Sequence, residues 1–158
     1  NGLFLAATHV AHDCVVGDNV IFANNAALGG HVKIGDNVML GGFASVQQWC
    51  RVGNYAMIGS QTAVDADVIP FAIAVGNRAT LTGINVIGLD RRGFNADEVD
   101  LLRQAFRDLF QSNGLFSERL GRLRDAYGKN PQVSQIINFI DGAAKNGICK
   151  VARKIKKC

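Results

Sequence analysis

Residues 9–68 decide the fold of this chain, and they read HVAHDCVVGDNVIFANNAALGGHVKIGDNVMLGGFASVQQWCRVGNYAMIGSQTAVDADV. A large apolar residue returns there at every sixth position without a break. Two positions before each of them stands a small residue, a β-branched residue or Cys, and Gly often follows directly. The large apolar positions are Val10, Val16, Phe22, Leu28, Ile34, Leu40, Val46, Val52, Ile58 and Val64. This is a hexapeptide repeat.

A six-residue unit with two inward positions is too short to hold a strand and its return, so it forms one side of a β-solenoid coil. Three units make a triangular coil of 18 residues, and successive coils hydrogen-bond to one another as parallel strands. Residues 18 apart in the sequence are therefore expected to lie one above the other, about 4.8 Å apart. The repeat pattern does not give the hand of the coil.

The repeat predicts three segments in the chain. Residues 1–70 form the hexapeptide-repeat β-helix, which ends at Pro70 because proline cannot donate to a strand ladder. Residues 71–94 are expected to form an irregular linker, and residues 95–158 a helical domain with a basic tail. The linker contains three turn-prone pairs, Gly76-Asn77, Thr82-Gly83 and Arg92-Gly93.

Beyond the linker the apolar period changes to that of α-helices. The first helix is expected to begin after Asn95, which has a capping-box pattern, and to run to about Ser112. A second helix starts near Ser117, and a third runs from an N-cap at Asn130 to near Gly142. These short amphipathic helices are predicted to pack as a helical module and cap the array.

The net charge of +4 is concentrated at the end of the chain. Such a basic tail is most simply solvated, although nucleic acid or an acidic protein partner could also bind it. The basic residues are Lys150, Arg153, Lys154, Lys156 and Lys157.

The sequence favours a cytoplasmic protein, because it contains no run long and apolar enough for a membrane span and does not begin like a secretion signal. Cys14 and Cys50 occupy inward positions of the repeat, and no cysteine has metal-knuckle spacing, so disulfides are not expected. The first eight residues are already in phase with the repeat and carry no polar cap. We therefore expect a fragment that lacks N-terminal coils.

Stacking at 18 residues per coil gathers polar residues at one corner of the solenoid. One column holds His12, Gly30 and Gln48, and the adjacent column holds Asp13, His31 and Trp49. A histidine beside a carboxylate can act as a general base, and a glycine N–H can stabilise an oxyanion. Two alternatives stay open, namely a merely solvated corner and a zinc site formed by the three histidines, of which His9 is the third.

Several segments resemble one family, the acyl-[acyl-carrier-protein]–UDP-N-acetylglucosamine O-acyltransferases. The repeat by itself is shared by many acyltransferases, whereas the segments after it are distinctive, and the resemblance covers essentially the whole chain. The matching segments are HVAHDC at 9–14, ANNA at 23–26, GGHV at 29–32, GNRAT at 76–80, GINV at 83–86 and GLDRRGF at 88–94.

The resemblance implies a left-handed parallel β-helix and a homotrimer with active sites between neighbouring subunits. It implies transfer of an (R)-3-hydroxyacyl group from acyl carrier protein to the 3-hydroxyl of UDP-N-acetylglucosamine, the first step of lipid A biosynthesis in a Gram-negative bacterium. The phosphopantetheine of the carrier protein brings the acyl group, so no other cofactor is expected. The resemblance also implies no metal, no nucleic acid and no stable membrane insertion.

The resemblance also assigns roles to residues of this chain. His12 is similar to the catalytic base, Asp13 to its supporting acid and Gly30 to the oxyanion donor. The residues implied in substrate binding are His9, His31, Gln48, Asn85, Arg91 and Arg92. Met57 and Ser60 resemble the acyl-length ruler, and because Ser60 fills space that a glycine would leave open, a shorter acyl chain is expected.

Two further readings differ in function class. One is a zinc-dependent lyase of the γ-carbonic anhydrase kind, built on the same solenoid. The other is a non-catalytic fragment, in which absent N-terminal coils would carry substrate contacts.

Overall fold

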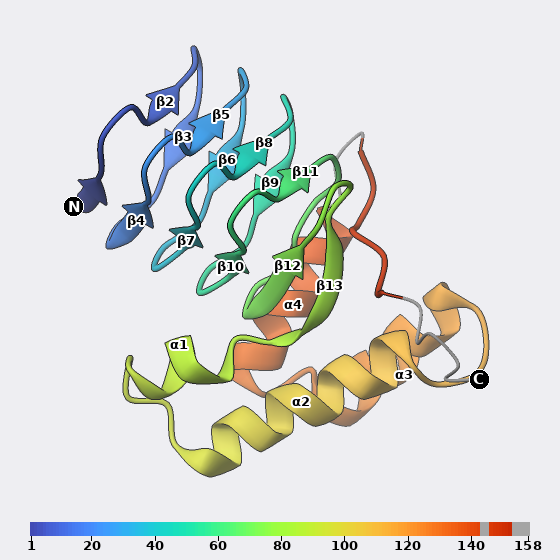
Figure 1. Ribbon diagram of the computed structural model, residues 1–158. Coiled ribbons are helices and arrows are strands. Elements are labelled where there is room, and N and C mark those ends of the chain that lie inside the picture. Colours follow the sequence, from blue (N-terminus) through green and yellow to red (C-terminus); the bar gives the residue numbers. More distant parts are fainter. Residues whose placement is uncertain (143–145, 153–158) are drawn as a thin grey trace, which may run out of the picture.

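The computed structural model describes residues 1–142 and 146–152 of the chain. The last four basic residues of the predicted tail, Arg153, Lys154, Lys156 and Lys157, lie outside the described residues. The described part is a parallel β-helix followed by α-helices, as the sequence predicts (Figure 1). None of the described helices is long and apolar enough to cross a membrane.

The first eleven strands of the described chain run along the three faces of the solenoid, three to each coil. They are β1 (Gly2–Phe4), β2 (His9–Val10), β3 (Val15–Val16), β4 (Val20–Phe22), β5 (Ala27–Leu28), β6 (Lys33–Ile34), β7 (Met39–Leu40), β8 (Ser45–Val46), β9 (Arg51–Val52), β10 (Met57–Ile58) and β11 (Ala63–Val64). Strands β12 (Ala72–Val75) and β13 (Thr80–Ile84) follow as an antiparallel hairpin.

The predicted 18-residue coil is confirmed by the strand register. Gly2 pairs with Val20 on the first face, His9 with Ala27 on the second and Val15 with Lys33 on the third, all in parallel pairs. We call these faces A (β1, β4, β7, β10, β12 and β13), B (β2, β5, β8 and β11) and C (β3, β6 and β9). The three edges of the prism are then the B/C, C/A and A/B corners.

The inward positions of the repeat build the core. Phe22, Leu28, Leu40 and Ile58 are almost fully buried, and the small inward positions such as Ala44 are closed as well. The burial of each large side chain contributes roughly 1.5–3 kcal/mol. The alternation of one large and one small inward residue therefore fills the narrow triangular interior and fixes which side chains face outward.

The chain turns at each corner through one residue in the left-handed backbone conformation. These residues recur every six positions, and three of them are asparagines, Asn19, Asn25 and Asn37, with φ between 55° and 62°. Asparagine tolerates this conformation better than most residues with a side chain. The corner geometry is thus a local property of the repeat.

The prediction that residues 71–94 form an irregular linker is wrong. After Pro70 the chain continues as β12, which pairs with β10 on face A, and β13 then pairs with β12. Alternation of small inward residues, Ala72 and Ala74, replaces the six-residue period there, and both are buried. The hairpin covers the edge of β10 that would otherwise lack a partner.

Two of the three turn-prone pairs of this segment are in turns, and the third is not. Gly76-Asn77 lies at the hairpin turn and Arg92-Gly93 at the turn after α1 (Val86–Asp90). Thr82-Gly83 lies within β13, where the register shifts because Ile73 pairs with Gly83 but Ala74 pairs with Leu81. The glycine accommodates this bulge, and its φ is +154°.

Three longer helices lie at the hairpin end of the solenoid (Figure 1): α2 (Ala96–Phe110), α3 (Phe116–Tyr127) and α4 (Pro131–Asp141). The predicted helix starts are confirmed, because Asn95 forms a capping box with Glu98 and Asn130 caps α4. Arg51 ties α4 to face C, since it donates to the backbone oxygen of Phe139 at 2.9 Å and binds the buried Asp67 at 2.8 Å.

Candidate active site

The predicted stacking of polar residues is found at the B/C corner. The His31 N–H donates to the backbone oxygen of His12 at 3.0 Å, and the Trp49 N–H donates to that of Gly30 at 3.1 Å. These bonds link successive coils, and on the two adjoining faces the strand register pairs residues that are 18 apart. This places His12, Gly30 and Gln48 in one column and His31 in the adjacent one, as the sequence predicts.

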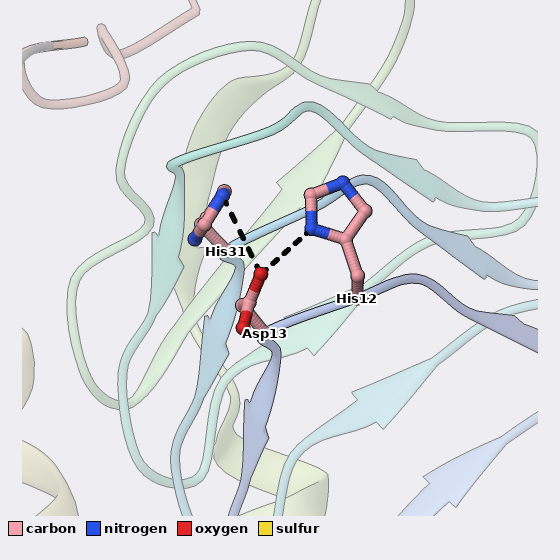
Figure 2. A group of neighbouring side chains, drawn as sticks. All are labelled: His12, Asp13 and His31. Atoms are coloured by element: carbon pink, nitrogen blue, oxygen red, sulfur yellow. Dashed lines mark hydrogen bonds and ion pairs between the residues drawn. The ribbon is translucent and has the colours of Figure 1, made fainter.

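His12 and Asp13 are in direct contact at this corner. Figure 2 shows Asp13 between the two histidine rings, with Nδ1 of His12 2.8 Å from its Oδ2 and Nε2 of His31 3.8 Å from the same oxygen. The hydrogen bond from His12, and then the charge of His31, hold the pKa of Asp13 below its ordinary value. An ionised carboxylate only accepts hydrogen bonds, so Nδ1 of His12 is the donor in this contact, and Nε2 is the ring nitrogen that remains for another partner.

Gly30 lies against the ring of His12 because it has no side chain. A Cβ on Gly30 would lie 2.6 Å from Cε1 and 2.7 Å from Nε2 of His12. Gly30 is buried, and no residue that the structure describes accepts a hydrogen bond from its N–H. Buried N–H groups without a partner are rare, so this donor beside a potential base is available to a ligand.

The equivalent N–H groups at the C/A corner are satisfied. There the Asp18 N–H donates to Oδ1 of Asp36 at 2.8 Å, and the Asp36 N–H donates to Oδ1 of Asn54 at 2.9 Å. Gln48 holds the corresponding place above Gly30, but its longer side chain is exposed and makes no such bond among the described residues. The B/C corner therefore differs from the C/A corner because the column of His12, Gly30 and Gln48 leaves the Gly30 N–H without a side-chain acceptor among the described residues.

The remaining predicted residues near this corner lie less close together. His9 opens β2 on face B and is exposed, and it does not join the cluster of His12, Asp13 and His31. Gln48 is held through its backbone oxygen, which accepts from Nδ2 of Asn146 at 3.2 Å. The ligand atoms of the cluster lie within 4.8 Å of one another, so these three side chains could also hold a metal ion.

Asn85, Arg91 and Arg92 lie at a different edge, the C/A corner. The Asn85 side chain caps α1 by accepting from the Gly88 N–H and also donates to the backbone oxygen of Tyr55 at 2.9 Å. Arg92 donates to the backbone oxygen of Asn19 at 3.3 Å. One chain therefore does not bring these residues together with His12, because face C separates the two edges.

A groove of roughly 530 Å³ runs beside these residues, and it has an apolar floor. Four outward side chains of face A form this floor in strand register, and Met57 is the one that the sequence analysis singled out. Ser60 lies beyond the end of β10, is exposed and does not line the groove. The floor residues are Ile21, Met39, Met57 and Ile73.

Sequence reasoning missed most of this floor, although a signal was present. On face A, the outward position just before each inward aliphatic residue holds a large apolar residue in every coil. The same position holds Ala27 and Ser45 on face B, and Lys33 and Arg51 on face C. A period of 18 in outward apolar residues would have indicated an apolar surface on face A.

Comparison with known families accounts for both parts of the chain. Residues 31–66 match the bacterial transferase hexapeptide model, and residues 67–149, more than half of the chain, match the model of UDP N-acetylglucosamine O-acyltransferase, domain 2. The chain belongs to the UDP-N-acetylglucosamine O-acyltransferase family. The resemblance found in its sequence motifs is thus confirmed.

Two members of this acyltransferase family illustrate the sequence similarity. The acyl-[acyl-carrier-protein]–UDP-N-acetylglucosamine O-acyltransferase of Caulobacter vibrioides is 50% identical over 155 residues, which are 98% of this chain and 59% of that protein. The relative of the same name in Aliarcobacter butzleri is 42% identical over 140 residues, 89% of this chain and 54% of that protein. The chain therefore spans somewhat more than half the length of these relatives.

Solved structures of the acyltransferase family share the fold. The UDP-N-acetylglucosamine acyltransferase of Campylobacter jejuni superposes with a TM-score of 0.89 at 39% identity, covering 96% of this chain and 58% of that one. The Arabidopsis enzyme gives a TM-score of 0.90 at 39% identity, covering 95% and 55%. These similarities confirm the predicted fold class, a left-handed parallel β-helix with a helical C-terminal part.

Proposed function

We propose that the protein transfers an (R)-3-hydroxyacyl group from acyl carrier protein to the 3-hydroxyl of UDP-N-acetylglucosamine, the first step of lipid A biosynthesis. The observation that carries the proposal is the hydrogen-bonded His12–Asp13 pair beside the Gly30 N–H. The relatives named above are acyl-[acyl-carrier-protein]–UDP-N-acetylglucosamine O-acyltransferases. In this proposal the enzyme works in the cytoplasm of a Gram-negative bacterium.

His12 is the general base of the proposed reaction. Its Nε2 takes the proton of the sugar hydroxyl while the oxygen attacks the thioester carbonyl, and the charge of Asp13 stabilises the imidazolium that forms. The carbonyl oxygen becomes an oxyanion and accepts the Gly30 N–H. Collapse of this intermediate breaks the C–S bond, and the departing sulfur of phosphopantetheine takes the proton back from His12.

The geometry favours direct attack over a covalent enzyme intermediate. Cys14 is the nearest thiol in sequence, but its Sγ donates to the backbone oxygen of Gly29 at 3.1 Å and packs against the core. The columns beside His12 contain no serine. In this scheme the acyl group stays on phosphopantetheine until the sugar attacks, and the protein supplies no cofactor of its own.

We further propose a homotrimer in which the B/C corner of one chain meets the groove of a neighbour. The observation in favour is that the two predicted sets of residues lie on different edges of one chain, so a second chain is needed to bring them to one substrate. His9, His31 and Gln48 would hold the sugar and phosphates. Asn85, Arg91 and Arg92 of the neighbour would hold the nucleotide, the arginines through charge-assisted hydrogen bonds.

The apolar floor of the groove suits an acyl chain. Met57 lies on this floor, whereas Ser60 lies outside the groove, at the corner that follows β10. If Ser60 limits the length, Ser60→Gly should shift the preference toward longer acyl donors. An assay across donor lengths measures this, and an unchanged preference in the variant would remove Ser60 from the ruler.

The proposed function is tested by His12→Ala. The variant should lose transfer of the acyl group from acyl carrier protein, while calorimetry still detects UDP-N-acetylglucosamine binding and light scattering still gives the wild-type assembly. Asp125→Ala is a matched control, because Asp125 is exposed on α3, far along the chain from both residue sets. Retained turnover in His12→Ala would refute the assignment of His12 as the general base.

A zinc-dependent enzyme of the γ-carbonic anhydrase kind is the second candidate. It is favoured by the cluster of His12, Asp13 and His31, whose ligand atoms lie within 4.8 Å. Stoichiometric zinc in the purified protein by elemental analysis, with loss of function on chelation, would support this candidate. Full acyl transfer by chelator-treated protein would exclude it.

A further inference from the structure

Trp49 lies at the candidate site, and the proposed function gives it no role. It stands one coil beyond His31, and its ring stacks on the imidazole with centroids 3.9 Å apart and planes 7° apart. We propose that Trp49 is a positioning residue that holds the His31 ring in the orientation in which it meets the sugar nucleotide. The inference rests on the proposed function, because that function assigns His31 to the substrate.

Polar contacts do not fix the orientation of His31. Nε2 of His31 forms an ion pair with Oδ2 of Asp13, but the two atoms lie 3.8 Å apart, which is beyond hydrogen-bonding distance. Asp13 instead bonds His12, and the His12 ring meets His31 edge-on, with centroids 5.0 Å apart. The stack on Trp49 is thus the contact that sets the tilt of the imidazole.

The stack also covers His31. Its side chain is 32% exposed, against 72% for His12 at the neighbouring column. A ring pressed on a flat aromatic surface has fewer orientations to lose when a ligand binds, so less entropy opposes binding. An imidazole positioned in this way is a better contact for a phosphate or a sugar hydroxyl than a freely rotating one.

The left-handed backbone at this column does not by itself select the two rings. His31 and Trp49 have φ of 61° and 68°, and the same place at other corners is filled by asparagine, such as Asn19, or by an aromatic residue, such as Tyr55. What distinguishes the B/C corner is the stack itself, in which the two ring centroids lie 3.9 Å apart.

A purely structural stack is the competing explanation, and the C/A corner provides an example. Tyr55 and Phe71 also stack in left-handed positions, with centroids 5.5 Å apart, but Phe71 is fully buried and the pair packs against the core. Trp49 is 43% exposed. The decisive experiment must therefore separate a contribution to stability from a contribution that acts through His31.

Trp49→Leu and Trp49→Phe form a matched pair, because leucine keeps an apolar side chain and phenylalanine keeps a ring. Trp49→Leu should raise the KM for UDP-N-acetylglucosamine about three- to tenfold with little change in kcat, and Trp49→Phe should remain near wild type. In a double-mutant cycle, Trp49→Leu should add no further loss to His31→Ala, because its effect passes through His31. Losses that add in the double variant overturn the inference.

NMR of protein with labelled histidine tests the stack without turnover. The His31 ring protons, assigned by their absence in His31→Ala, should show a ring-current shift that Trp49→Phe retains in part and Trp49→Leu loses. An active wild type whose Trp49→Leu variant keeps both the shift and the KM refutes the inference alone. A wild type that binds UDP-N-acetylglucosamine but transfers no acyl group from any donor refutes the proposed function and the inference together.

Discussion

Gly30→Ala is expected to disable the site while leaving the fold intact. The added Cβ would lie 2.6 Å from Cε1 of His12, whereas ordinary contacts begin at 3.4 Å, so the ring must move by roughly 0.8 Å. His12 is exposed and can swing away, and the backbone of Gly30 is not in the left-handed region. The change in the free energy of unfolding should therefore stay within about 0.5 kcal/mol.

The cost of this substitution to the proposed acyl transfer should be much larger. Displacing a reacting group by about 1 Å costs on the order of a hundredfold in rate, or about 2.7 kcal/mol of transition-state stabilisation. Steady-state transfer of the acyl group gives kcat/KM, and thermal unfolding gives the stability. Gly121→Ala in α3 is the matched control, because its Cβ would meet nothing within 4 Å and the activity should not change. Wild-type kcat/KM in Gly30→Ala would refute the placement of His12.

Three other substitutions or measurements follow from the structure. Asp67→Ala should lower stability by about 3–5 kcal/mol in thermal or urea unfolding, because it leaves Arg51 without its buried carboxylate; Asp125→Ala, which removes an exposed carboxylate, should change stability little. Burial raises the pKa of the Cys50 thiol to about 11 and that of the Cys149 thiol to about 12. Iodoacetamide at pH 8 should therefore modify both thiols far more slowly in the folded protein than in the denatured protein. Mass spectrometry of the modified peptides measures this difference. The pKa of Asp13 in the folded protein lies below its ordinary value of 3.8, so any stabilisation from this group is present above pH 3.8 and is lost as the pH falls through the lower folded value. NMR titration should find the pKa of Asp13 nearer to 3.8 in His12→Ala. An unchanged pKa would contradict the hydrogen bond from His12.

Much of the fold could be predicted from the sequence because the repeat is local. The inward residues follow from a six-residue period, and the helix ends follow from caps such as Asn95 and Asn130, whose side chains bond N–H groups two or three residues away. The hairpin of β12 and β13 could not be predicted in the same way. Its inward residues, Ala72 and Ala74, are small, and its position depends on the free edge of β10.

Part of the candidate site also follows from the local repeat, and part depends on tertiary contacts. The sequence by itself determined which residues share a column, because a coil of 18 residues fixes the axial neighbours of His12, Gly30 and Gln48. Only the tertiary structure decided that Asp13 contacts His12, that Trp49 stacks on His31, and that Asn85 and Arg92 lie on another edge. The reason is that the repeat period fixes distances along the solenoid axis, whereas contacts across a corner and between edges depend on side-chain rotamers and on where the chain turns after the last coil.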